Sequence, residues 1–289
     1  MVKIYGMTNP NEQGFFLIVS EPIKHDMRTY FSLANRAILA LNDESRFLRP
    51  FRSLLDRINA LLHINDDFVL RPIDVLMIET SGGSFEFKIG FISPNPQIGP
   101  NLSSMEYASQ IVRGWINIPT NRLSNDMKLL LAVMGNYNPA CKYNLKMLCR
   151  SPVFYVNKKE ALIDFVIKLH RVMINQSSSI NTAVHKKLVQ AFQIMNIRNI
   201  FSTSCKWYSI GHASAEIRDC INAKPSSVVN RVTHMVRGIR NIVVHIFPHA
   251  KDCLDYAVVY DGIEQMSPGC WAALHFAALE ILPHEFTED

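Results

Sequence analysis

Hydrophobic and polar positions follow different patterns in the two halves of this 289-residue chain. Near the start, short apolar runs at residues 2–7 and 14–22 are separated by turn-forming residues, which is typical of short β-strands. Residues 25–42 and 47–63 carry apolar side chains at helical spacing instead. The pattern therefore predicts two strands followed by two helices.

A β-hairpin is the clearest local signal in the first half. Residues 74–93 contain two runs of β-forming residues that flank the turn Ser81–Gly83. In the second run, Phe85, Phe87 and Ile89 alternate with polar neighbours, as in a strand with one buried face. The first half is therefore predicted to mix helices and strands.

The second half is dominated by helical periodicity. The helices predicted there cover residues 104–115, 124–135, 158–174, 180–195, 212–222, 226–247 and 267–282. A loop rich in proline precedes them at residues 93–103. We therefore expect an α+β protein, with a mixed α/β region of unknown role at residues 1–125 and an all-α helical bundle at residues 126–289.

Composition narrows the class of protein. With 48% hydrophobic and 19% charged residues, the chain is typical of a globular protein with a sizeable core. The sequence shows neither a signal peptide nor an apolar run long enough to span a membrane, so a cytoplasmic protein is expected. The six cysteines contain no C-x-x-C pair, and we expect them to be reduced core residues.

Charge is distributed unevenly along the chain. Residues 127–251 contain 18 Lys and Arg against four acidic residues, a net charge of +14, whereas the whole chain carries +5. Such a concentration of positive charge is expected for a protein that binds a polyanion, although a solvated basic face would produce the same count. The charge therefore indicates where to look for a binding site.

The predicted helix at residues 226–247 carries polar groups among apolar ones. They recur at intervals of three and four residues, which places them on one stripe of the helix: Asn230, His234, Arg237, Asn241 and His245. Histidine transfers protons near neutral pH, and arginine binds phosphate oxygens through a planar fork of donors. The stripe has the residue types needed to cleave RNA without a metal ion. The alternative is that these are buried polar groups that form hydrogen bonds to neighbouring helices and have no catalytic role.

A short motif in this helix resembles a known family. The sequence Arg240-Asn241-x-x-x-His245 is similar to the R-x(4–6)-H motif of HEPN-domain ribonucleases. The resemblance implies a helical-bundle domain at about residues 150–285, a homodimer with both motifs facing one cleft, and endoribonuclease activity without cofactors. It assigns Arg240 to the scissile phosphate, Asn241 to support of the site and His245 to proton transfer or electrostatic stabilisation. From their place on the same stripe, His234, Arg237 and Asn230 are expected to support these residues.

The same resemblance suggests a biological setting. Many members of the family are toxins or host-defence nucleases against viruses, so a regulatory or neutralising protein partner is expected. RNA would be bound by basic residues outside the motif, and the candidates are Lys142, Lys146, Arg150, Lys186, Lys187 and Lys206. No membrane partner is expected.

Three alternatives follow from the same residues. Arg57 and His63 also satisfy the motif, although without an adjacent Asn. His245, His249 and Cys253 have a spacing that suggests zinc, but Pro248 interrupts the helix between the two histidines, and we expect no metal site. The third alternative is a non-catalytic helical protein that binds RNA or assembles with a partner.

Overall fold

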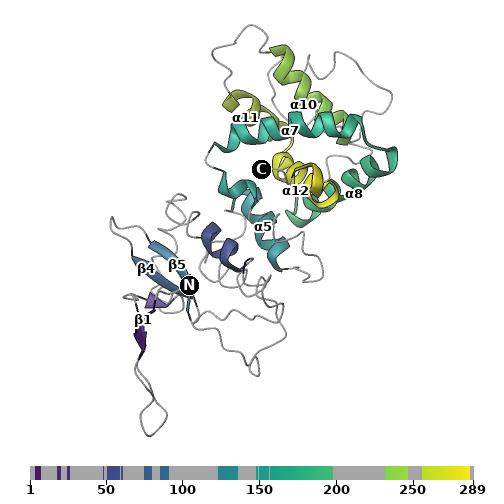
Figure 1. Cartoon of the computed structure of the whole chain (residues 1–289). Coiled ribbons are helices and arrows are strands. Elements are labelled where there is room, and N and C mark those ends of the chain that lie inside the picture. Colours follow the sequence, from purple (N-terminus) through teal and green to yellow (C-terminus); the bar gives the residue numbers. More distant parts are fainter. Residues whose placement is uncertain are drawn as a thin grey trace. The chain divides into compact units, whose positions relative to one another are not determined.

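The computed structural model of the chain forms two compact units, residues 1–122 with 131–149, and residues 123–130 with 150–289 (Figure 1). The structure describes residues 4–7, 18–20, 25–26, 48, 51–58, 60, 75–79, 85–90, 123–135, 148, 150–155, 157–197, 232–246 and 256–286. Among these residues helices predominate.

The first unit contains short antiparallel strands. Strand β1 (Ile4–Met7) pairs with β2 (Ile18–Ser20), in the two stretches where strands are predicted. A second sheet has the order β3-β4-β5, formed by β3 (His25–Asp26), β4 (Val75–Glu79) and β5 (Phe85–Ile89). The prediction of a helix at residues 25–42 is wrong at its start, because the backbone of β3 pairs with β4. Residues 27–42 lie outside the described residues.

The predicted hairpin is confirmed. Strands β4 and β5 are antiparallel, with Val75 opposite Ile89 and Glu79 opposite Phe85. Alternation explains why β5 forms, since Phe87 and Ile89 are fully buried whereas Glu86 and Lys88 are partly exposed.

The helix at residues 51–58 belongs to the same unit and falls within a predicted helix. It buries one stripe, formed by Phe51, Leu54, Leu55 and Ile58, which is the periodicity that predicts it. Arg57 on this helix donates a hydrogen bond to the carbonyl oxygen of Phe87 and forms an ion pair with Glu86. These contacts link the helix to the hairpin.

The described part of the second unit is a helical bundle. Its elements are the segment 125–130 of α5 (Asn125–Gly135), η3 (Pro152–Phe154), α7 (Lys158–Ile174), α8 (Ser178–Ile194), α10 (Val232–Ile246), α11 (Tyr256–Met266), α12 (Cys270–Ile281) and η4 (Pro283–Glu285). Helix α12 is apolar around its whole circumference, and residues 270–279 are all buried. It packs against α8 and α7, while α10 and α11 pack against α7 (Figure 1).

Most helices of the second half coincide with predictions. Helix α7 begins and ends at the predicted residues, and α5, α8, α10 and α12 overlap their predicted ranges. Helix α11 is not predicted from the sequence, whereas the predicted helices at 104–115 and 212–222 lie outside the described residues. Cys270 is buried as expected, and the other five cysteines lie outside the described residues.

Among the helices of the described ranges, none combines the length and the apolar character needed to cross a bilayer.

Candidate functional site

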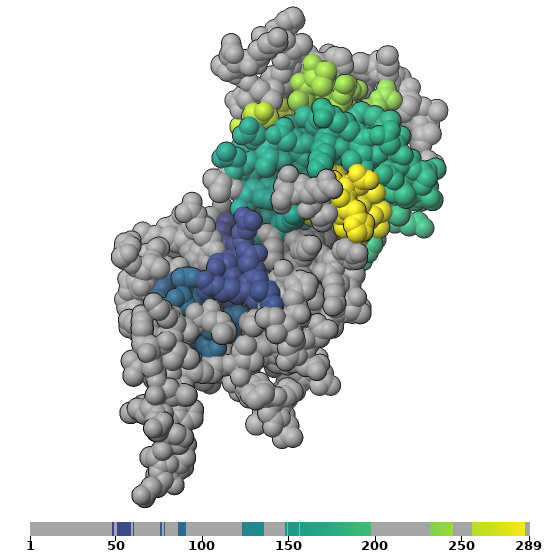
Figure 2. Space-filling view, viewed as in Figure 1, coloured from purple at the N-terminus to yellow at the C-terminus, as the bar shows by residue number. Residues whose placement is uncertain are grey.

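Helix α10 presents two different sides. Its buried side is made of aliphatic residues and methionine, namely Val232, Met235, Val236, Ile239 and Ile242. The other side carries Arg237, Arg240 and Asn241, which are partly exposed, and Val244, which is 40% exposed. Figure 2 shows α10, in green, at the molecular surface beside α7, in teal. Arg240 and Asn241 are therefore partly accessible to solvent.

The motif arginine contacts its neighbour. The guanidinium Nη1 of Arg240 donates a hydrogen bond to Oδ1 of Asn241 over 3.2 Å. This bond uses one N–H donor of the arginine and restricts its rotamers. Asn241 is therefore placed to orient Arg240.

A second arginine lies on the same side of α10. Arg237 precedes Arg240 by three residues, so the two side chains are neighbours on the helix surface. No carboxylate among the described residues forms an ion pair with either guanidinium. Two adjacent cations repel each other, and this repulsion favours the binding of an anion.

The other predicted residues of the stripe are placed differently. His234 lies at the edge of the buried side, 8% exposed, and its pKa is lowered, mainly by burial and secondarily by the charge of Arg237. His245 is in the last turn of α10, and its side chain is not among the described ones. Asn230 lies outside the described residues. The structure therefore gathers His234, Arg237, Arg240 and Asn241 on one helix.

A histidine that the sequence does not single out joins this group. His170 on α7 is partly buried, and its pKa is lowered by burial first, then by the charges of Arg240 and Arg237. The charges of both arginines thus act on this imidazole. The sequence contains no local sign of this electrostatic effect, because the effect depends on the packing of α7 on α10.

The basic residues predicted to bind RNA do not share one environment. Arg150 donates a hydrogen bond to the carbonyl oxygen of Phe286, so this cation is engaged within the bundle. Lys187 forms an ion pair with Glu280, with 3.1 Å between Nζ and Oε1, and Lys186 is exposed. The remaining candidates, Lys142, Lys146 and Lys206, lie outside the described residues.

The arginine of the other motif copy, Arg57, makes different contacts from those of Arg240. Arg57 is engaged by Glu86 and by the carbonyl oxygen of Phe87, and it belongs to the first unit. His63 lies outside the described residues. The contacts of Arg57 are those of a residue that joins a helix to a sheet.

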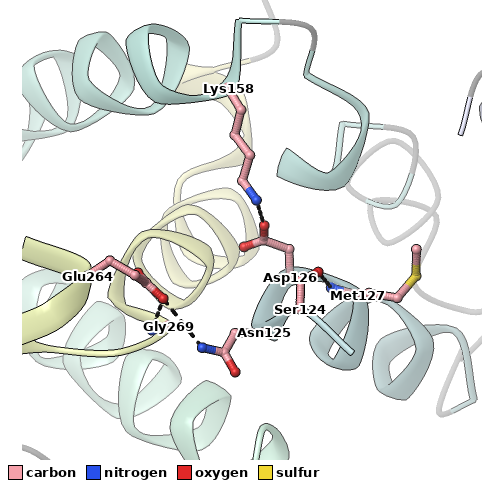
Figure 3. Close-up of polar contacts among 7 residues, drawn as sticks. All are labelled: Ser124, Asn125, Asp126, Met127, Lys158, Glu264 and Gly269. Carbon is pink, nitrogen blue, oxygen red and sulfur yellow. Dashed lines mark hydrogen bonds and ion pairs between the residues drawn. The ribbon is translucent and has the colours of Figure 1, made fainter. Parts of the chain in front are cut away.

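A further cluster of charged groups lies where α5 begins (Figure 3). Asp126 is buried and pairs with Lys158 at the start of α7. The carboxylate of Glu264 accepts hydrogen bonds from the backbone N–H of Gly269 at 2.7 Å and from the amide of Asn125 at 3.3 Å. Burial nevertheless raises the pKa of Glu264. Because these groups satisfy one another, we interpret the cluster as structural.

Within the ranges that the structure describes, no group of three or more His, Cys, Asp or Glu side chains is arranged to hold a metal ion. His249 and Cys253 lie outside those ranges, so the predicted absence of zinc stays a prediction.

Comparison with known proteins adds no family to this description. No protein-family model matches the chain. No curated protein shows significant sequence similarity to it. The class that the described residues define is a protein with a C-terminal helical bundle that carries a cationic helix face.

Proposed function

We propose that the chain is a metal-independent endoribonuclease of the HEPN type, whose site is centred on Arg240, Asn241 and His245 of α10. The observation that carries this proposal is the environment of Arg240. Its guanidinium is partly exposed, is oriented by Asn241 and lies beside Arg237, with no carboxylate from the described residues to neutralise either arginine.

The chemistry needs few protein groups. The ribose 2′-hydroxyl of the substrate attacks the adjacent phosphorus, and its proton passes to a histidine acting as general base. The bond between phosphorus and the 5′-oxygen breaks while a protonated histidine or water gives a proton to the leaving oxygen, which yields a 2′,3′-cyclic phosphate and a 5′-hydroxyl. Arg240 stabilises the negative charge that develops on the phosphate oxygens. His245 is the expected proton carrier.

Helix geometry supports a site shared between two chains. Residues five positions apart on an ideal α-helix project about 140° apart, so Arg240 and His245 of one helix do not face the same phosphate. A homodimer resolves this difficulty, because one chain then contributes the arginine and its partner the histidine. The expected biological role is that of a toxin or host-defence effector in the cytoplasm, controlled by a neutralising protein.

The test is a cleavage assay with end-labelled RNA and excess chelator. We expect the full chain to cut the RNA, and Arg240→Ala and His245→Ala each to slow cleavage by roughly 100-fold or more. Arg52→Ala, which removes an exposed arginine from the first unit, is the matched control and should cut normally. RNA that is bound but never cut would favour the non-catalytic RNA-binding alternative.

The shared site has its own test. Arg240→Ala and His245→Ala chains are each expected to be inactive alone. When the two are mixed and allowed to exchange, a heterodimer recovers one intact pair, so activity should partly return. Absence of recovery in a mixture shown to contain heterodimers would contradict the composite site.

A further inference from the structure

We draw no further inference here: the strongest candidate, the hydrogen-bonded pair of Tyr155 and buried His275 in the core of the helical unit, is accounted for by its packing there, and nothing in the described part of the bundle shows a ligand or a second arrangement of the pair.

Discussion

His275 lies in the core of the helical unit, where it is 3% exposed. Its Nε2 atom is 2.8 Å from the hydroxyl of Tyr155, and the ring of Phe165 packs against it with 4.7 Å between ring centroids. Burial, helped by the charge of Arg150, lowers the pKa of His275 to about 3. The side chain is therefore neutral in the folded protein, and its role is structural.

The buried imidazole predicts a pH dependence of stability. The unfolded chain binds a proton at about pH 6.5, whereas folded His275 does not until about pH 3, so stability is complete above 6.5 and falls as the pH drops toward 3. Between pH 7 and pH 5 this group should lower the free energy of unfolding by about 2 kcal/mol. Urea denaturation at the two pH values measures the loss.

Two variants separate titration from hydrogen bonding. His275→Gln should reduce the pH dependence, since the titrating group is gone. Tyr155→Phe removes the hydroxyl but keeps the imidazole, so it should lower stability and preserve the pH dependence. Equal pH dependence in the wild type and His275→Gln would show that other groups cause it.

Neighbouring lysines at the start of α7 provide a second comparison. Lys158 pairs with buried Asp126, whereas Lys159 and Asp261 are 43% and 51% exposed. Lys158→Ala leaves a buried carboxylate without its cation and should cost about 1–3 kcal/mol. Lys159→Ala should cost about 0.5 kcal/mol or less, because exposed ion pairs contribute little. Thermal or urea unfolding of both variants checks the difference, and equal losses would contradict it.

At the level of elements, the turn between α11 and α12 relies on one glycine. Gly269 has a φ of 75°, a left-handed conformation, and its N–H is held by Glu264. A Cβ atom at this position would lie 2.7 Å from Cδ1 of Ile197. Both the backbone conformation and the lack of space therefore favour glycine.

Substitution of this glycine tests both causes. Gly269→Ala should lower the free energy of unfolding by about 1–3 kcal/mol. Ile197→Val removes the contacting methyl group, and alone it should cost about 0.5–1.5 kcal/mol. If the clash matters, the double variant loses less than the sum of the two single variants. Strict additivity in urea unfolding would leave the backbone conformation as the sole cause.

The elements also show what the sequence predicts well. Helix α7 begins and ends where predicted, because its buried residues recur at intervals of three and four. Helix α11 is not predicted, since its Val258-Val259 pair, two tyrosines and Gly262 are weak helix formers. Packing of Val259, Ile263 and Met266 in the bundle outweighs these local preferences.

The candidate site also contains some features that the sequence predicts and others that it does not. A short local motif predicts Arg240 and Asn241 as site residues. In the structure, Arg240 donates a hydrogen bond to Asn241. The effect of the arginines on His170 is not predicted by a local motif, because it depends on how α7 packs on α10. Strand β3 is not predicted from the sequence for a similar reason, since its pairing with β4 is not local.

For the whole molecule, two copies of the same short motif fall in different units. Arg57 belongs to the first unit and joins a helix to the hairpin, whereas Arg240 belongs to the helical bundle. Arg57→Ala should therefore lower stability by about 1–3 kcal/mol and leave RNA cleavage per folded molecule unchanged. Urea unfolding and the cleavage assay, run on the same preparation, check both parts. Loss of cleavage in a folded Arg57→Ala protein would show that the first copy takes part in the reaction.

The most direct measurement of the central claim identifies the ends of RNA cut by the full chain in excess chelator. Attack by the 2′-hydroxyl predicts products with a 2′,3′-cyclic phosphate and a 5′-hydroxyl, formed by the wild type and by Arg52→Ala but not by Arg240→Ala. RNA that stays intact with folded wild-type protein, or the same products at the same rate from Arg240→Ala, would contradict the account.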